Sequence, residues 1–256
     1  AGASGLIVRS ATQVDAELIA AAGSSLAVVG RAGVGLDNVD TAAATANGVM
    51  VVNAPESNIT SAAEHTMALL LAQARNVPQA HSALVDGRWE RSKWEGVELE
   101  DKTLGVVGFG RIGRLVAHRA VAFGMKIVAH DPFVPAEAAK YLDVEFLELD
   151  DLVARADFLT LHVAKTRETI GLINKERLGL AKPHLRIVNV ARGGIIDELA
   201  LAEAVASGQI AGAAIDVFDD EPTTESPLIG VPGIVTTPHP VSYTHLTLPT
   251  IRLGWW

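Results

Sequence analysis

The sequence predicts an α/β protein in which helices cover parallel β-sheets, and three observations support this fold class. Short aliphatic runs alternate with helix-forming segments along most of the chain, as in consecutive strand–helix–strand units. A glycine-rich loop joins one of these strands directly to an amphipathic helix. The 256 residues, 49% of them hydrophobic, are enough for two domains that each bury a core.

The composition excludes several classes of protein. A formal net charge of −9 argues against a protein that neutralises nucleic-acid phosphates. The chain has no cysteine, which excludes disulfides, thiolate metal sites and a cysteine nucleophile, and suits a reducing cytoplasm. No apolar run approaches the roughly 18 residues that a membrane-spanning helix needs. We therefore expect a cytoplasmic protein without a metal, whose partners are small molecules or proteins and not membranes.

The first fifty residues predict a parallel sheet with helical connections. Strand-like runs cover residues 6–8, 26–29 and 50–52, and Ala-rich helical segments cover residues 14–22 and 41–46. This βαβαβ order is typical of a parallel sheet. A long helix should follow over residues 62–75, since capping residues precede it, and Pro78 should end or kink it.

An extended arm is expected over residues 86–102, which carry Trp89 and Trp94 without a clear period. Two tryptophans on such a segment would expose a large apolar surface, so we expect the arm to pack against a partner subunit. Packing of both within their own subunit is the alternative. We place the domain boundary in this arm, so that residues 1–98 and 99–239 form the two domains.

The second domain contains a longer series of strands and helices. Strands are expected over residues 104–107, 126–129, 158–161, 186–190 and 213–217, and helices over residues 111–123, 149–155 and 198–206. Five strands separated by helices predict a doubly wound parallel sheet of the Rossmann type. Ligands of such sheets bind beyond the carboxyl ends of the strands, so polar residues that directly follow strands are the candidates for function.

A GxGxxG loop formed by Gly108, Gly110 and Gly113 follows the first of these strands and opens its helix. The first glycine permits a tight turn, the second lets a pyrophosphate approach the backbone, and the third lets the helix pack against the strand. The helix N-terminus at Arg111 and Ile112 then supplies backbone N–H donors for phosphate. The strand and helix context predicts a dinucleotide site and argues against an ordinary turn.

The cofactor type is predicted by Asp131, which ends the next strand at nearly the usual spacing of about 20 residues from the loop. Its carboxylate would accept hydrogen bonds from the adenosine ribose hydroxyls and repel a 2′-phosphate. Pro132 follows in place of the arginine of many NADP sites. The sequence therefore predicts NAD as the cofactor.

Three polar residues after later strands are candidates for catalysis. Arg192 follows the strand of residues 186–190, Glu221 follows residues 213–217, and His239 follows a short apolar strand at residues 233–235. An arginine binds a carboxylate bidentately, and a histidine oriented by a carboxylate is the usual base near neutral pH. Taken singly, an arginine after a strand is more often part of a surface ion pair, an acidic run is more often a solvated turn, and a histidine is usually structural.

With these motifs in this order, the chain resembles the D-isomer-specific 2-hydroxyacid dehydrogenases. The resemblance is carried by the glycine loop and by residues 189–194, 216–222 and 237–239, and it covers about residues 1–239. Residues 30–40 and 53–64 are most similar to the branch that acts on 3-phospho-D-glycerate. The resemblance implies a second, flavodoxin-like substrate domain, truncated here, and a homodimer or homotetramer.

The resemblance also implies roles for individual residues. Arg192 would hold the substrate carboxylate, His239 would be the acid/base, and Glu221 would orient His239. Asp216 would contact the nicotinamide carboxamide, and Thr166 would lie in a cofactor loop.

Contacts to the substrate are implied in the first domain. They would come from the backbone of Val34 and Gly35, from Asn58, and from Arg9 or Arg31 to the phosphate. Surface charge is the alternative for the two arginines.

The implied reaction is the NAD-dependent oxidation of 3-phospho-D-glycerate to 3-phosphooxypyruvate, the first step of L-serine biosynthesis. Alternatives are a reductase for glyoxylate or hydroxypyruvate, and an NAD-sensing binding protein of the corepressor type. A Rossmann methyltransferase is a further alternative, but it would leave Arg192, Glu221 and His239 without a role.

The chain departs from the family pattern in three places. Residues 162–166 lack the proline usual in that loop, which should make the loop less rigid. The chain opens at Ala1 just before a strand, and residues 240–256 resemble a vector-derived tail. Pro240 should hold His239 in extended backbone angles. We therefore expect a fragment that binds NAD(H) but turns over no substrate as written.

Overall fold

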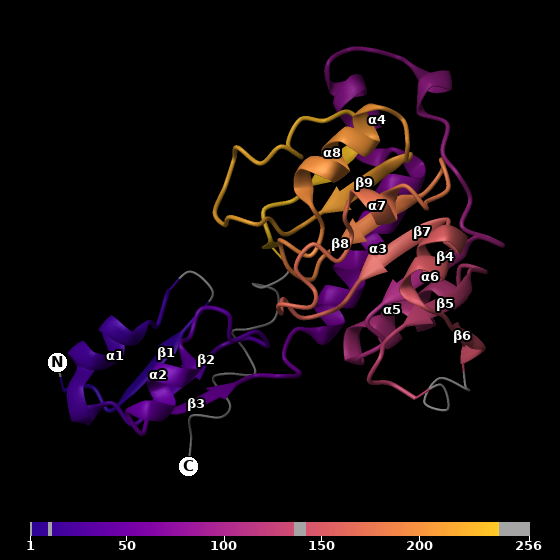
Figure 1. Cartoon of the computed structure of the whole chain (residues 1–256). Helices are drawn as coiled ribbons and strands as arrows, with labels where there is room; N and C mark the ends of the chain where they lie inside the picture. Colours follow the sequence, from indigo (N-terminus) through magenta and orange to yellow (C-terminus); the bar gives the residue numbers. More distant parts are fainter. Residues whose placement is uncertain (1, 10–11, 136–141, 241–256) are drawn as a thin grey trace. The chain divides into compact units, whose positions relative to one another are not determined.

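The computed structural model describes residues 2–9, 12–135 and 142–240, and it confirms the α/β fold class (Figure 1). The chain divides into two compact units, the first ending at Ser61 and the second running from Ala62 to Pro240. All strand pairs recorded in the two sheets are parallel. Within the described residues, no helix is long and apolar enough to span a membrane. The expected tail, apart from Pro240, lies outside the described residues.

The first unit is a three-stranded parallel sheet with two helices. Its elements are β1 (Gly5–Val8), α1 (Ala16–Ala22), the 3₁₀ helix η1 (Gly23–Ser25), β2 (Val28–Arg31), α2 (Thr41–Ala46) and β3 (Met50–Asn53), with strand order β1-β2-β3. The helices begin where capping predicts, because the carboxylates of Asp15 and Asp40 accept hydrogen bonds from backbone N–H groups in the first turns of α1 and α2.

Among the described residues, one face of this small sheet carries a buried core. Val8 and Val29 pack in a buried cluster with Ile19 of α1 and Ala44 of α2. Strand side chains alternate between faces, so their neighbours Ile7 and Val52 point to the other side, where both are exposed. The first unit therefore presents an apolar sheet face in addition to its core.

The long helix α3 (Ile59–Arg75) begins three residues earlier than residue 62, the predicted start. It ends at Arg75 because Asn76 has a left-handed backbone, and a second helix, α4 (Val77–Val85), begins there with Pro78 in its first turn. The side chain of Gln73 donates hydrogen bonds to the carbonyls of Ala213 and Gly233. Most of α3 thus belongs to the second unit, and the compact units divide at Ser61 instead of in the arm. A substrate-binding role for residues 1–98 stays a prediction.

The second unit is a doubly wound sheet of seven parallel strands among the described residues, in the order β10-β9-β8-β7-β4-β5-β6. The strands are β4 (Thr103–Val107), β5 (Lys126–His130), β6 (Val144–Phe146), β7 (Phe158–Leu161), β8 (Arg186–Asn189), β9 (Gly212–Ile215) and β10 (Ile234–Thr236). The helices after α4 are η2 (Arg91–Trp94, 3₁₀), α5 (Arg111–Val121), α6 (Leu149–Arg155), α7 (Lys175–Leu178) and α8 (Glu198–Ala206).

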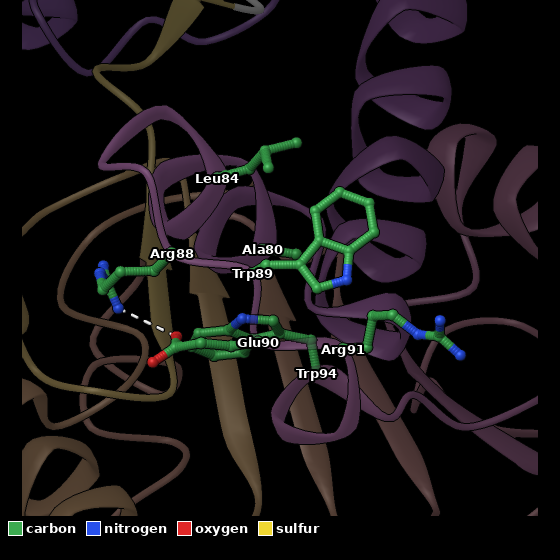
Figure 2. A pocket seen from close by; sticks show the side chains of 7 residues that line it. All are labelled: Ala80, Leu84, Arg88, Trp89, Glu90, Arg91 and Trp94. Carbon is green, nitrogen blue, oxygen red and sulfur yellow. Dashed lines mark hydrogen bonds and ion pairs between the residues drawn. The ribbon is translucent and has the colours of Figure 1, made fainter.

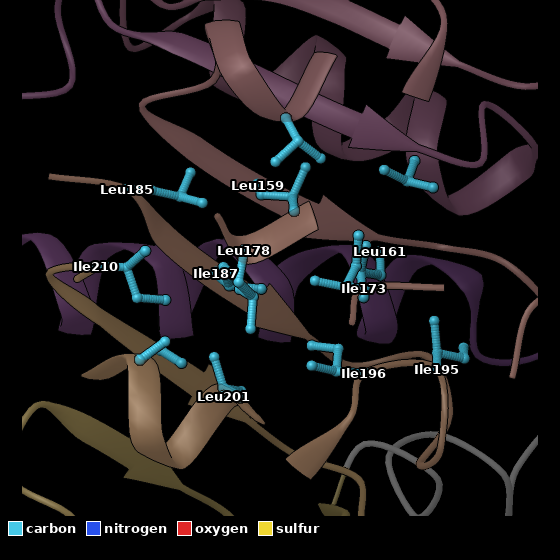
Figure 3. Packing of buried hydrophobic residues seen from close by; sticks show 14 of the residues in the cluster. Leu159, Leu161, Ile173, Leu178, Leu185, Ile187, Ile195, Ile196, Leu201 and Ile210 are labelled. Carbon is cyan, nitrogen blue, oxygen red and sulfur yellow. The ribbon is translucent and has the colours of Figure 1, made fainter. Parts of the chain in front are cut away.

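The predicted Rossmann topology is confirmed, with β6 as an additional strand. β6 has only three residues and no buried side chain, so it gives no hydrophobic run that would predict it. The order of the strands reverses between β4 and β7, which is where such sheets bind dinucleotides. Aliphatic side chains from β7, β8, α7 and α8 form a large buried cluster beside this point (Figure 3).

At the amino-terminal edge of this sheet, Asp157 acts as a clamp just before β7. Its carboxylate accepts hydrogen bonds from the backbone N–H of Thr103 at 2.7 Å and from Lys182 Nζ at 2.7 Å. Burial alone would raise the pKa of Asp157, but the hydrogen bonds from Lys182, Thr103 and His184 lower it to about 2. The ionised carboxylate therefore stabilises the fold.

We expect Asp157→Asn to lower the free energy of unfolding of the second unit by about 2 kcal/mol at neutral pH. A carboxyl whose pKa is lowered by folding contributes stability above its unfolded pKa near 3.8, and this contribution is lost as the pH falls towards 2. Urea denaturation between pH 7 and pH 2 checks this. Asp150→Asn, which removes a carboxylate from an exposed ion pair, is the control, and an equal loss in both variants would contradict the clamp.

Candidate active site

The candidate residues of the second unit gather at the carboxyl edge of its sheet because six strands end there level with one another. In the register, β4, β5 and β7 end side by side at Val107, His130 and Leu161, and β8, β9 and β10 end side by side at Asn189, Ile215 and Thr236. The residues that follow these strands therefore share one edge of the sheet. This is the edge at which open α/β sheets bind ligands.

The three glycines of the GxGxxG loop occupy distinct environments. Gly108 has a φ of 89°, and a Cβ there would lie 2.5 Å from the carbonyl oxygen of His162. A Cβ on Gly113 would lie 2.1 Å from the carbonyl oxygen of Gly108, so glycine is required for the close approach of α5 to β4. A Cβ on Gly110 would meet no atom within 4 Å. The second glycine thus faces open space, as the approach of a pyrophosphate requires.

Helix α5 begins at Arg111 and Ile112, and its N-cap residue is Gly110, which has no side chain to cap the helix. The Asp131 carboxylate accepts hydrogen bonds from the backbone N–H of Phe109 at 2.8 Å and of Phe133 at 2.9 Å. These bonds fix the carboxylate against the glycine loop. A helix N-terminus that follows a glycine, beside a fixed carboxylate, fits the pyrophosphate and ribose of NAD.

The loop after β8 carries Arg192 and is braced by Asn189. The Asn189 side chain accepts a hydrogen bond from the N–H of Ala191 at 3.0 Å and donates one to the carbonyl of Arg192 at 2.9 Å. A Cβ on Gly193 would lie 1.7 Å from the carbonyl oxygen of Phe218, so this loop is in backbone contact with the loop after β9. Glycine at 193 therefore brings the Arg192 loop against the loop that holds Glu221.

Glu221 and His239 form a hydrogen-bonded pair. His239 Nδ1 lies 2.7 Å from Glu221 Oε2, and Glu221 Oε1 accepts a hydrogen bond from the N–H of Phe218 at 2.9 Å. A carboxylate can only accept, so Nδ1 donates and the imidazole is held in one orientation. The structure thus brings together Glu221 and His239, two of the three residues that the sequence singled out for catalysis.

Electrostatics keep the carboxyl group of this pair ionised. Burial alone would raise the pKa of Glu221, but the hydrogen bonds from His239 and Phe218 and the positive charge of Arg192 hold it below its usual range.

The prediction of extended backbone angles at His239 was wrong, because its φ is 51°. This value lies in the left-handed region, which a non-glycine residue seldom adopts.

The loop after β7 contains the residues in which the chain departs from the family pattern. Burial lowers the pKa of His162 to about 3, so its imidazole is neutral. Lys165 forms an ion pair with Asp219 at 2.9 Å, which links this loop to the loop after β9. Thr166 N–H donates to Thr169 Oγ1 at 2.8 Å within a turn. A cofactor contact by Thr166 stays a prediction.

Asp216 directly follows β9 and is fully buried. Its Oδ1 accepts hydrogen bonds from Thr237, which belongs to the motif at residues 237–239, and from His65, which the sequence analysis did not single out. Its Oδ2 is buried and has no hydrogen-bond partner among the described residues. His65 lies in α3, and 151 positions separate it from Asp216. The only sequence signal for it is a histidine within an otherwise largely apolar helix.

The predicted substrate residues lie in the first unit, in the segments that follow β1, β2 and β3. Arg31 ends β2, and its Nη1 donates to the carbonyl of Ala32 at 2.7 Å. Asn38 donates to the carbonyl of Arg9 at 2.7 Å, which ties the segments after β1 and β2 together. Asn58 Oδ1 is buried without a hydrogen-bond partner among the described residues.

Val34 and Gly35 belong to the same loop of the first unit. The carbonyl of Val34 accepts a hydrogen bond from the Asn53 side chain at 2.7 Å. This bond joins the loop after β2 to the end of β3. The substrate contacts of both residues stay predictions.

A doubly wound sheet with this glycine loop, a carboxylate at the end of its second strand and a histidine–carboxylate pair defines the class of NAD-binding dehydrogenase domains. Residues 67–240 match the sequence model described as "D-isomer specific 2-hydroxyacid dehydrogenase, NAD binding domain". The chain therefore belongs to the D-isomer specific 2-hydroxyacid dehydrogenase family, which confirms the resemblance seen in the sequence. NAD is accordingly the cofactor.

Comparisons with individual proteins agree with this family. The chain is 57% identical over 237 residues to "D-3-phosphoglycerate dehydrogenase" of Mycobacterium bovis, covering 93% of this chain but only 45% of the relative. It is similar to the solved structure of D-lactate dehydrogenase from Aquifex aeolicus complexed with NAD and lactic acid, with a TM-score of 0.87, 30% identity and coverage of 98% and 80%.

A glyoxylate reductase structure from Paecilomyes thermophila is also similar, with a TM-score of 0.87, 32% identity and coverage of 98% and 77%. The chain thus spans about half the length of the curated relative and more than three quarters of each of the two solved structures.

Proposed function

We propose that the full-length protein oxidises 3-phospho-D-glycerate to 3-phosphooxypyruvate with NAD, the first step of L-serine biosynthesis. The observation that carries this proposal is the 2.7 Å pair of His239 and Glu221 at the same sheet edge as the glycine loop and Arg192. The identity of 57% to a D-3-phosphoglycerate dehydrogenase favours this substrate over other 2-hydroxy acids.

In this proposal Arg192, His239 and Glu221 each have a separate role in the reaction. Arg192 binds the substrate carboxylate through its planar guanidinium and so orients C2. His239 takes the proton of the C2 hydroxyl at Nε2, while Glu221 holds Nδ1 and stabilises the imidazolium that forms. Bound NAD⁺ supplies the hydride acceptor for the hydrogen on C2. The C2–H bond breaks and the C2–O bond becomes a carbonyl.

The substrate proposal is tested by comparing 3-phospho-D-glycerate with D-glycerate in a version extended to the length of the curated relatives. Removal of the phosphate should lower kcat/KM by at least about tenfold, because Arg9 or Arg31 would lose a charged partner. Equal rates would contradict the phosphate contact. Faster reduction of glyoxylate would favour the second candidate, which the structural similarity to a glyoxylate reductase supports.

The cofactor preference gives a prediction of its own. Asp131→Arg should weaken NADH binding by about tenfold or more and favour NADPH relative to NADH, because a cation replaces the carboxylate that would accept the ribose hydroxyls. Titrations of the purified chain with both dinucleotides check this. Asp101→Arg changes an exposed carboxylate and serves as the control. An unchanged preference in Asp131→Arg would contradict the assigned role.

We also infer that the protein is a homodimer or homotetramer through the arm, residues 86–102. Trp89 is 75% exposed, and it lines an apolar hollow with Trp94 and with Ala80 and Leu84 of α4 (Figure 2). A large exposed aromatic beside an apolar hollow is typical of a protein interface. A second copy of the chain is the occupant that best fits the family's oligomers.

Trp89→Glu should therefore convert the oligomer to a smaller species, because the interface would have to bury a carboxylate. Light scattering of the extended version gives the molar mass. Leu199→Glu, an exposed substitution in α8, should leave the mass unchanged. A wild type that is purely monomeric would contradict the inference.

A cytoplasmic location belongs to the same proposal. The chain has no cysteine and therefore forms no disulfide, which suits the reducing environment of the cytoplasm.

We also propose that the chain as written is inactive. Its first unit leaves Ile7 and Val52 exposed on one sheet face, and this apolar surface favours association through that face over a catalytically competent arrangement.

A further inference from the structure

The two carboxyl oxygens of Asp216 differ in their hydrogen bonding. Oδ1 accepts a hydrogen bond from Thr237 Oγ1 and lies 3.1 Å from His65 Nε2. Oδ2 is buried and has no partner among the described residues. A buried carboxylate oxygen without a donor costs free energy, so Oδ2 is placed to accept a hydrogen bond from a ligand.

His65 is held to Asp216 by chemistry that fixes its tautomer. Asp216 is 0% exposed, and an ionised carboxylate only accepts hydrogen bonds. His65 Nε2 must therefore carry the hydrogen that lies between them. The same nitrogen is 3.4 Å from Thr237 Oγ1, so α3, β9 and β10 meet at Oδ1.

The orientation of Asp216 follows from these contacts. The β9 backbone fixes its Cα, and the two donors at Oδ1 fix the rotation of the carboxyl plane, which determines where Oδ2 points. Without His65, the Thr237 hydroxyl would be the one side-chain donor left at Oδ1 among the described residues.

We propose that His65 is a positioning residue for the nicotinamide end of the cofactor. It holds Oδ1 so that Oδ2 accepts a hydrogen bond from the carboxamide N–H of the nicotinamide. The inference rests on the NAD-binding function and on the cofactor contact implied for Asp216, and it adds a residue from α3 to that contact. The adenosine end, which lies at Asp131, does not depend on it.

A matched pair of variants tests this role. In His65→Gln the amide Nε2 reaches nearly as far as the imidazole Nε2 and still donates, whereas in His65→Asn the amide Nδ2 sits on a shorter side chain and does not reach Asp216 Oδ1. His81→Asn, an exposed substitution in α4, is the control. Calorimetric titration of the full chain with NADH and with ADP-ribose, which lacks the nicotinamide, gives the Kd values. Thermal melting without ligand shows that each variant is folded.

We expect His65→Asn to weaken NADH binding by roughly tenfold, since one hydrogen bond to a charged group is lost, and to change ADP-ribose binding by less than about twofold. His65→Gln should recover most of the NADH affinity. Equal weakening of both ligands would show a merely structural role and overturn the proposal. An unchanged NADH affinity in a folded His65→Asn chain would also overturn it. A wild-type chain that binds neither ligand would overturn the NAD-binding function itself.

Discussion

Replacement of His239 by asparagine is expected to lower kcat for 3-phospho-D-glycerate by about a thousandfold and to leave NADH affinity within about twofold of the wild type. A positioned general base contributes roughly a hundredfold to ten-thousandfold to a rate, and an amide cannot take the hydroxyl proton. Steady-state kinetics of the extended version and an NADH titration give the two quantities.

Two further variants make the His239 result specific. Glu221→Gln should lower kcat less, because it keeps a hydrogen bond to Nδ1 but loses the charge that stabilises the imidazolium. His118→Asn in α5 should leave kcat unchanged. If His239→Asn lost NADH affinity in proportion to kcat, His239 would be part of the cofactor site and not the base.

Replacement of Arg192 by lysine is expected to lower kcat/KM by about a hundredfold. An ammonium cannot form the two parallel hydrogen bonds of a guanidinium to a carboxylate, so the substrate is held less firmly and in more orientations. The NADH Kd should change by less than about twofold. The difference between these two effects is the quantity that identifies the role.

The control for Arg192→Lys is Arg155→Lys, which alters an exposed ion pair with Glu145 and should change neither quantity. Comparable losses in kcat/KM and NADH affinity for Arg192→Lys would instead indicate that the loop after β8 had collapsed. Thermal melting distinguishes that outcome from a loss of substrate binding.

Most of the second unit could be predicted from the sequence because its strands are continuous apolar runs and its helices begin at recognisable signals. The strand of β7 and the helix α8 fall at the predicted residues. β6 was not predicted because it is three residues long and none of its side chains is fully buried. The division at Ser61 could not be predicted either, because contacts that join α3 to the second unit, such as those of Gln73 with Ala213 and Gly233, link residues 140 and 160 positions apart.

The sequence singled out Arg192, Glu221 and His239, and the resemblance implied that Glu221 orients His239, but the residue pattern alone could not show that all three lie close together. Arg192, Glu221 and His239 come together only because β8, β9 and β10 are neighbours in the sheet and end level. His65 was missed because a helix far away in the sequence carries it. The φ of His239 was mispredicted because the hydrogen bond to Glu221 and the loop geometry outweigh the usual preference before proline.

The most direct test of the account is to mix the extended version with NAD⁺ and 3-phospho-D-glycerate and to follow NADH by its absorbance, after an NADH titration of the same preparation. We predict saturable NADH binding and NADH formation that depends on both substrates and is abolished by His239→Asn. Tight NADH binding without hydride transfer from any 2-hydroxy acid would contradict the account.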